Sequence, residues 1–579
     1  MTFSSTPVLP HAIQAPASWK RSMRRLTAVG MACMLTACST VQLPVWTGAS
    51  APPPVQSGTP PITKTTPASP AISQPVAPVA PLTPLPYNPA IEARFPDPSV
   101  RYETPGLGPN RQQFTTQTEM SAWLQSLAGK VGDGQRLDVA TIGTSQRGLP
   151  LLTLIATQGQ STQATALNSN GKPTVLLVGQ QRGDEPAGAE ALLVIARELG
   201  KGGLLSPLLQ QINIIIVPRA NPDGAQALTP HTADGTDLAR DHLILSTPEA
   251  QALAKLSRNY RPVAVIDLRE FAAAGPFLQK FQAVQRYDLL LQPAATPNNH
   301  EFVAKAAREW FTNPMRSALD SADISNEWYS EPSAQSGDQS LSMAQPTADS
   351  LINASTLKNA ASIMVASRGS DLNRLHIQRR VHSLVTATNS ALRNAAAKAK
   401  NLHQVESFVT RDIASQACRN TMAIQSQLTP EQRSIGMLQA DSGQELQARV
   451  DWNSSLTLKA SQTRPRPCGY WVSASASQAV ERLRMLGAQV MQIAEPGQML
   501  ADSYQTQSSS GNLVLTRGAI DTPMSSYYVS LNQAKANLIA AALEPDTPYS
   551  YLSKHLITMP SDVARVVAPP SVVFEEEAE

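Results

Sequence analysis

Arginine and carboxylate side chains follow two apolar runs of this chain, where a folded protein places its reactive groups. Arg182 and Glu185 come after the run Thr174–Gly179, and Arg269 follows the run Val263–Asp267. A guanidinium has five N–H donors and no acceptor lone pair, and it stays protonated at any tolerable pH. It can therefore pair with a carboxylate but cannot bind a metal ion. The sequence predicts ion pairing or carboxylate recognition at these positions.

The same runs are expected to be buried strands of an α/β fold. A continuous apolar run is typical of a strand that is covered on both faces. Helices are expected at 186–199 and 248–260, and a longer one at about 372–400 has apolar residues at helical spacing. Strands that alternate with helices predict a three-layer α/β/α domain with a central, mostly parallel mixed sheet. In such a sheet, functional groups gather at the carboxyl ends of the strands.

Five segments, taken together, resemble the M14 zinc carboxypeptidases, in the bacterial branch that overlaps with the succinylglutamate desuccinylase-like proteins. The resemblance covers residues of about 114 to 400, and it implies a carboxypeptidase-like fold for them. The segments are Gln181-Arg-Gly-Asp-Glu-Pro186, Pro218-Arg-Ala-Asn-Pro-Asp-Gly224, Gly235-Thr-Asp-Leu-Ala-Arg-Asp-His242, Asp267-Leu-Arg-Glu270 and Val365-Ala-Ser-Arg-Gly369.

The resemblance also implies that the zinc site is degenerate. In active members, the first segment supplies a His and a Glu ligand, the fourth a second His, and the fifth a Glu that activates the zinc-bound water. Here Glu185 is the one surviving ligand, Arg182 and Arg269 stand at the His positions, and Ala366 stands at the position of the general base. One carboxylate falls short of the three protein ligands that a catalytic zinc requires. No intact catalytic residue and no cofactor are expected.

A charged network is the expected replacement for the metal ion. We expect Arg182 and Arg269 to pair with Glu185, and also with Asp267 or Glu270. The alternative is that one or both arginines point to solvent, because long cationic side chains reach water readily.

Other polar residues of the five segments have separate expected roles. Arg240 remains where the family often has Asn-Arg to handle the substrate carboxylate and carbonyl, while Ala239 replaces the Asn. His231 and His242 have no ligand-like spacing to Glu185. His242 is expected to hydrogen-bond locally, as isolated histidines usually do.

The N-terminal segment resembles a bacterial lipoprotein signal. Basic residues between Lys20 and Arg25 precede a short apolar run at 26–37, and small residues stand directly before Cys38. A transmembrane anchor is the alternative, but the run is well short of the roughly 20 residues needed to span a bilayer. The resemblance implies that Cys38 is lipidated, and Ser39 after it favours the outer membrane, facing the periplasm.

Composition divides the rest of the chain. The signal peptide and lipobox are expected at 1–38, a disordered Pro-rich linker at 39–112, the carboxypeptidase-like domain at 113–402, and a smaller, partly β C-terminal α+β domain with an acidic tail at 403–579. Cys418 and Cys468 lie in the exported part, where an oxidising compartment favours a disulfide. Two buried free thiols are the alternative.

The expected function combines these features. The chain has 47 basic and 44 acidic residues and no basic block outside the N-terminus, which excludes nucleic acid as a partner. We expect a lipid-anchored envelope pseudo-peptidase that binds peptide C-termini, cell-wall peptides or other carboxylate ligands through Arg240, Arg182 and Arg269. The alternative is an active zinc metallocarboxypeptidase that acts in proteolysis or cell-wall peptide trimming. A third hypothesis is a structural role in an envelope assembly, with the C-terminal domain as the contact surface.

Overall fold

A computed structural model of the chain describes residues 89–128, 134–335, 337–506, 513–547 and 549–575. The chain divides into two compact units, residues 1–79 and 80–579, and the described residues all belong to the second. The expected signal peptide, Cys38 and residues 39–88 of the expected linker lie outside the described residues. Residues 89–112, which were expected to belong to the same disordered linker, are described, and Ile91, Phe95 and Leu107 among them are buried because they pack against the folded part. Among the described helices, none is both long and apolar enough to cross a bilayer.

The largest sheet has eight strands in the order β1-β2-β4-β3-β5-β11-β7-β8. The four central strands β4, β3, β5 and β11 are parallel to their neighbours within this group. Outside it, β2 is antiparallel to β4, β1 is antiparallel to β2, and β7 is antiparallel to β11. The strands are β1 (Gln135–Thr144), β2 (Pro150–Gln158), β3 (Thr174–Gly179), β4 (Asn213–Val217), β5 (Ala264–Phe271), β7 (Leu289–Pro293), β8 (Asn326–Trp328) and β11 (Ala361–Arg368). The predicted α/β class with a mixed sheet is confirmed.

The central strands are apolar on both faces because their alternate side chains enter two different cores. Val175 and Leu177 of β3 belong to one hydrophobic cluster, and Leu176 and Val178 belong to another. Successive side chains of a strand point to opposite faces, so a strand covered by helices on both sides needs an unbroken apolar run. This explains why β3 has the bounds that its composition predicts.

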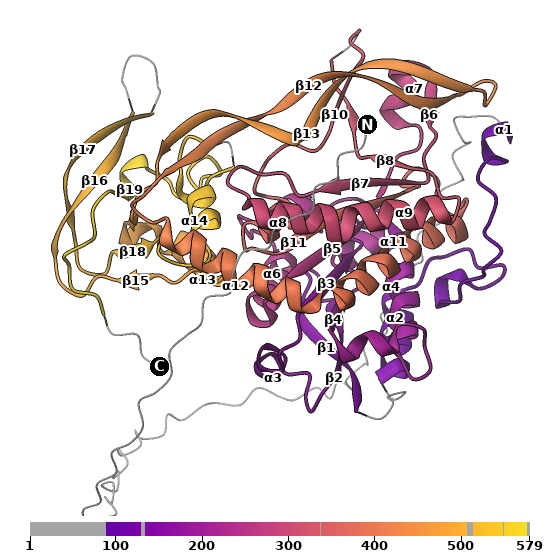
Figure 1. Ribbon diagram of the computed structural model, residues 1–579, viewed down its shortest axis with the longest axis horizontal. Helices are drawn as coiled ribbons and strands as arrows, with labels where there is room; N and C mark the ends of the chain where they lie inside the picture. Colours follow the sequence, from indigo (N-terminus) through magenta and orange to yellow (C-terminus); the bar gives the residue numbers. More distant parts are fainter. Residues whose placement is uncertain (1–88, 129–133, 336, 507–512, 548, 576–579) are drawn as a thin grey trace, which may run out of the picture. The chain divides into compact units, whose positions relative to one another are not determined.

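Helices cover both faces of this sheet (Figure 1). Helix α4 begins at Pro186, whose fixed φ suits the first helical turn, and it ends before Gly200. The described helices are α1 (Pro89–Glu92), α2 (Gln117–Ala128), α3 (Ala164–Ser169), α4 (Pro186–Leu199), α5 (Pro222–Ala227), α6 (Pro248–Tyr260), α7 (Gly275–Phe281), α8 (Glu301–Ala306), α9 (Asn313–Ser321), α10 (Leu351–Thr356), α11 (Ile377–Ala397), α12 (Ala399–Ser415), α13 (Ser477–Met485) and α14 (Ala536–Leu543).

The long helix expected at about 372–400 begins later than predicted. His376, with φ 56°, has a left-handed backbone conformation that a helix interior does not allow, and α11 starts one residue after it. At Lys398 the backbone leaves helical geometry for one residue, and α12 follows. Two helices therefore replace the single one expected.

Two further sheets make the C-terminal part rich in β structure. The long strands β12 and β13 form a ribbon that reaches β6 (Figure 1). This five-stranded sheet contains β6 (Ala283–Gln285), β9 (Glu331–Pro332), β10 (Ser340–Ser342), β12 (Thr421–Gln439) and β13 (Glu445–Pro465). The six-stranded sheet contains β14 (Gly469–Val472), β15 (Met491–Gln492), β16 (Gly497–Thr506), β17 (Leu513–Thr522), β18 (Tyr527–Ser530) and β19 (Val563–Val566).

The boundary expected between residues 402 and 403 falls inside α12. Residues from both sides of it share one hydrophobic cluster, in which Leu176 and Val265 of the large sheet join Val480 and Leu538 of the C-terminal part. The C-terminal part therefore contributes to a core that it shares with the α/β sheet. In the same part, Cys418 and Cys468 form a disulfide.

Candidate functional site

The candidate site lies at the carboxyl ends of β3, β5 and β11, which are adjacent in the large sheet. The turn that follows β3 starts at Gln180, with φ 47°, and leads into α4. Gly183 lies so close to the turn at Gly224 that an added Cβ would be 1.9 Å from the Gly224 carbonyl carbon. Only glycine permits this approach. The first two segments noted in the sequence are therefore packed against each other.

Glu185 and Arg269 form a buried, bidentate ion pair at the centre of this site. Arg269 Nε lies 2.6 Å from Glu185 Oε2, and Arg269 Nη2 lies 3.1 Å from Glu185 Oε1. The side chains are 2% and 10% exposed, respectively, and the Glu270 backbone N–H also donates to Glu185 Oε2. Burial alone would lower the pKa of Arg269, but the carboxylates of Glu185 and Asp267 raise it above its ordinary value. Arg269 is therefore a permanent cation.

Arg182 has a different partner from the one expected. Its Nη2 and Nε donate to the two carboxylate oxygens of Asp237, at 2.6 and 3.3 Å, and the Arg182 side chain is 34% exposed. Asp237 is held in place because it also accepts a hydrogen bond from the Ala239 backbone N–H. The expected triad of both arginines on Glu185 is therefore wrong for Arg182. Two separate ion pairs take its place.

Glu270 also pairs elsewhere than expected. Arg380 of α11 donates to Glu270 Oε1 from Nε at 2.8 Å and from Nη2 at 2.5 Å, and both side chains are fully buried. An added Cβ at Gly369 would lie 2.3 Å from Arg380 Nε, and Gly369 has φ 149°. Gly369, the residue after β11, therefore leaves room for the buried ion pair between Arg380 and Glu270.

A chain of buried polar groups links Asp267 to His242. Gln181 Nε2 donates to Asp267 Oδ1 at 2.7 Å, and Gln181 Oε1 lies 2.5 Å from His242 Nε2. Burial lowers the pKa of His242 to about 3, so its imidazole is neutral and can donate from Nε2. His242 thus bonds locally, through Gln181. Asp267 Oδ2 also lies 3.8 Å from Arg269 Nη1. Asp267, rather than Glu270, is therefore the second carboxylate that contacts Arg269.

Asp267 gives the site a testable pH dependence. Burial raises its pKa to about 6, although Arg269 and Gln181 act in the opposite direction, against 3.8 for an ordinary Asp. Because the folded state binds the proton of the Asp267 carboxyl more tightly than the unfolded state does, the protonated carboxyl stabilises the fold. This stabilisation is fully present below about pH 4 and is lost as the pH rises through 6. Two pKa units correspond to about 3 kcal/mol. Asp267→Asn should therefore gain about 3 kcal/mol over the wild type between pH 4 and 7.

Urea unfolding of both chains at several pH values measures this difference. The control is Asp320→Asn, which changes an exposed carboxylate far from the site in sequence. A stability gap between Asp267→Asn and wild type that does not change with pH would contradict the assigned burial effect.

Ala366 occupies a fully buried position beside Arg269. In the β5–β11 pairing it is directly opposite Arg269, and on its other side it is opposite Leu290 of β7. It belongs to an apolar cluster with Phe271 and Leu290. A methyl side chain in this position has no group that can accept a proton from water.

Arg240 is the most accessible of the three arginines expected to bind a ligand. Its side chain is 44% exposed, and Nη1 donates to Thr347 Oγ1 at 3.0 Å and to Asp349 at 3.3 Å. Among the described residues, no hydrogen-bond partner is recorded for its Nε and Nη2. Ala239 beside it is buried. Arg240 and Arg182 each pair with one acid and retain donors for an incoming carboxylate, whereas the guanidinium of Arg269 is buried beside Glu185 and Asp267.

The donor set of this site does not fit a zinc ion. Both oxygens of Glu185 face the guanidinium of Arg269, and neither Arg182 nor Arg269 has a lone pair to offer. Within the described ranges, no group of three or more His, Cys, Asp or Glu side chains is placed to hold a metal ion. His231 is exposed, and its backbone carbonyl accepts a hydrogen bond from Thr229 Oγ1.

Several residues of the site were missed or given no role by the sequence alone. Asp237 and Gln181 stand inside the quoted segments, but nothing in their spacing identifies them as partners of Arg182 and Asp267. Arg219, in the second segment, is buried; its Nε donates to Gln180 Oε1 at 2.7 Å, and its Nη2 donates to the Thr115 carbonyl at 2.5 Å. It fixes the turn that carries Arg182. The sequence signal that could have indicated this is an arginine placed between an apolar strand and an Asn-Pro-Asp-Gly turn.

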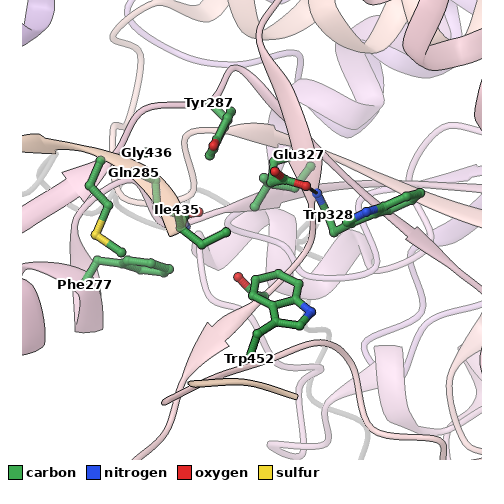
Figure 2. Close-up of a pocket in the computed structure, with 11 residues that line it drawn as sticks. Phe277, Gln285, Tyr287, Glu327, Trp328, Ile435, Gly436 and Trp452 are labelled. Carbon is green, nitrogen blue, oxygen red and sulfur yellow. Dashed lines mark hydrogen bonds between the residues drawn. The ribbon is translucent and has the colours of Figure 1, made fainter. Parts of the chain in front are cut away.

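An aromatic pocket lies close to Ala366 but is separate from the arginines. It is lined by Phe277, Tyr287, Trp328 and Trp452, together with Leu290, and Figure 2 shows Glu327 among these rings. The cavity has a volume of about 10 Å³, enough for roughly one water molecule. A peptide side chain does not fit it in this conformation.

Comparison with known sequences identifies the class of part of this domain. Residues 120–243 match the sequence family described as zinc carboxypeptidase, Peptidase_M14. The chain is 25% identical over 406 residues to Carboxypeptidase 2 of Trichophyton rubrum, which covers 67% of this chain and 75% of the relative. A stretch of 97 residues is 36% identical to Carboxypeptidase D of Mus musculus, covering 14% and 7% of the two chains.

Among solved structures, a metallo-carboxypeptidase from Burkholderia cenocepacia aligns over 50% of this chain and 69% of its own, with 14% identity and a TM-score of 0.35. The family match at residues 120–243 indicates that the chain contains an M14 carboxypeptidase-like domain. The matched family segment includes Arg182, Glu185 and Arg240 but ends before Arg269 and Ala366.

Proposed function

We propose that this chain is a non-catalytic, carboxypeptidase-like binding protein of the bacterial cell envelope. The observation that carries the proposal is the buried pair of Arg269 with both oxygens of Glu185. A carboxylate held by a guanidinium on both oxygens has its strongest acceptor directions filled, so a cation cannot bind there unless Arg269 leaves. The position of the family's metal is instead filled by a protein cation.

The loss of hydrolysis follows from the side chains that remain. In a zinc carboxypeptidase the metal lowers the pKa of water from about 16 toward 7, and a carboxylate takes its proton. Arg182 and Arg269 cannot hold such a metal, and Ala366 cannot take the proton. With these three side chains the site can still bind a substrate but cannot hydrolyse it.

The ligand that suits this site carries a free carboxylate. Arg240 is half exposed and has two guanidinium nitrogens for which no bond within the described residues is recorded. A planar guanidinium binds a carboxylate through two parallel hydrogen bonds. Arg182 is partly exposed, and its Nη1 has no hydrogen-bond partner among the described residues. Peptide C-termini and cell-wall peptides have this chemistry, and we take them as the ligand class.

The proposed location rests on the N-terminal sequence. Basic residues, a short apolar run and small residues before Cys38 favour lipid anchoring, and Ser39 favours the outer membrane, facing the periplasm. The Pro-rich composition of residues 39–88 suits an extended tether between the lipid and the folded part. A ligand of the cell wall lies within reach of such a tether.

Calorimetric titration with a peptide tests the proposal. A short peptide with a free C-terminus should bind, and the same peptide with an amidated C-terminus should bind about 10 to 100 times more weakly, since a charged hydrogen bond is worth about 1.5–3 kcal/mol. Arg240→Gln should lose the preference for the free acid, whereas Arg147→Gln, which changes another arginine near the turn before β2, should keep it. An equal affinity for acid and amide in the wild type would contradict carboxylate recognition.

An active zinc metallocarboxypeptidase is the second candidate function. The observation that favours it is the similarity to proteins named carboxypeptidase over two thirds of this chain. Metal analysis separates the two candidates, because the enzyme would contain about one zinc per chain and would release C-terminal residues in a chelator-sensitive way. The proposed binding protein does neither.

A further inference from the structure

One edge of the six-stranded sheet is open. Strand β17 (Leu513–Thr522) is the last strand in the order β15-β18-β14-β19-β16-β17, and it pairs with β16 on one side. On its other side, none of the described strands pairs with it. The strand is ten residues long and contains no proline. Its unpaired backbone N–H and C=O groups form a template for another strand.

The opposite edge of the same sheet is covered. The end of the chain runs beside β15, where Phe574 forms a β-bridge with Ile493 and stacks on Tyr528. The Glu575 N–H donates to the Gln492 carbonyl, and the Ala494 N–H donates to the Val573 carbonyl, each at 2.9 Å. The sheet therefore has one edge protected by its own chain and one without such protection among the described residues. Soluble proteins seldom leave a long edge strand unprotected.

We propose that β17 pairs with β17 of a second copy of this chain, in an antiparallel arrangement about a two-fold axis at Ala519. In this register Arg517 faces Asp521 of the other copy, and Gly518 faces Ile520. In an antiparallel pair, two residues that face each other both direct their backbone N–H and C=O groups toward the other strand, or both direct them away from it. These directions alternate along a strand, so a residue can face only a position an even number of residues away in the other copy. The two-fold axis therefore passes through a residue. The contact is isologous, so each pairing occurs twice.

Charge selects this register. The Arg517 side chain is 61% exposed and pairs with Asp502, the residue opposite it on β16. Asp521 is exposed and accepts a hydrogen bond from Gln498, which is opposite it on β16. Side by side, the two copies would form a continuous row in which Arg517 lies between Asp502 of its own chain and Asp521 of the other. Opposite charges directly across a strand pair are stabilising.

Shape and the neighbouring registers lead to the same choice. A Cβ at Gly518 would meet no atom within 4 Å, so the space beside it can receive the side chain of Ile520 from the other copy. An axis at Arg517 would place the two Arg517 side chains directly opposite each other. An axis at Gly518 would place Leu515 opposite Asp521, with no charge partner. The register centred on Ala519 is the one that satisfies both charges.

Disulfide cross-linking tests the register directly. In full-length chain with Cys33→Ser and Cys38→Ser, Ala519→Cys should form a covalent dimer under mild oxidation. Residues opposite each other in an antiparallel pair have Cα atoms about 4.5–5.5 Å apart, which is within disulfide range. Val514→Cys is the matched control on the same strand, because its two copies would lie about 30 Å apart. Cross-linking by both variants or by neither would overturn the proposed register.

Charge reversal tests the same contact without a cysteine. By sedimentation velocity, Asp521→Lys should weaken dimerisation roughly tenfold, because two ion pairs become repulsions. Adding Arg517→Glu to this variant should restore the dimer, whereas the exposed Glu481→Lys on α13 should leave it unchanged. A monomeric wild type at all concentrations, or a double variant no better than the single one, would overturn the proposal.

Discussion

Glu185→Gln is expected to destabilise the folded chain by about 3–5 kcal/mol, one of the largest losses that a single isosteric change can produce here. The amide keeps the size and one acceptor of the carboxylate but removes its charge. Arg269 is then left in a buried position with Asp267, 3.8 Å away, as its nearest carboxylate. A buried cation without a full counter-charge is costly because the protein interior solvates it poorly. Equilibrium urea unfolding at neutral pH measures the loss.

The exposed pair of Arg94 with Glu445 provides the control for this experiment. Glu445→Gln removes the same kind of charge from a side chain that is 47% exposed, and it should cost less than about 1 kcal/mol. The double variant Glu185→Leu with Arg269→Met should recover most of the lost stability, because apolar side chains can replace a buried ion pair. A loss for Glu185→Gln no larger than that for Glu445→Gln would show that the pair is solvated.

If the proposed function is correct, Arg182→His combined with Arg269→His should create a zinc site that the wild type lacks. Two imidazoles with Glu185 give three protein ligands, the number found in catalytic zinc sites. Asp237 and Asp267, which now contact the two arginines, are placed to orient the imidazoles through their second nitrogens. We expect zinc affinity to rise on the order of a thousandfold or more, to about one ion per chain. Metal analysis after dialysis and calorimetric titration measure it.

Two further variants make this result specific. Arg182→Lys combined with Arg269→Lys keeps both positive charges and should bind no zinc, which excludes an effect of removing bulk alone. Adding Ala366→Glu to the histidine variant should produce release of C-terminal residues that a chelator stops. A correctly folded histidine variant that fails to bind zinc would mean that these positions do not correspond to the family's ligands.

Buried strands were the part of the fold that the sequence predicted best. The run at 174–179 is β3 with the expected bounds, because a strand that helices cover on both faces shows a nearly continuous apolar run. Strand β12 (Thr421–Gln439) was missed, since its middle part, around Pro430, is largely exposed and lacks an apolar alternation. Periodicity carries little information where neither face of a strand is buried.

The positions of the site residues were predictable, but their partners were not. Strand ends locate Arg182, Glu185 and Arg269 within one edge of the sheet. An arginine side chain can reach several carboxylates from one backbone position. The acid with which it pairs therefore depends on which distant segments of the chain fold next to it. Asp237, fixed by the turn that precedes Arg240, is nearer to Arg182 than Glu185 is, and the sequence order gives no sign of this.

The separate counter-ions of Arg182 and Arg269 make the two positions interdependent in any change of charge. Replacing either arginine alone by a neutral side chain would leave one acid, Asp237 or Glu185, without its positive partner and would offer at most one imidazole to a metal ion. Under the proposed function, stepwise recovery of a metal site would therefore pass through a variant that is less stable than the present chain.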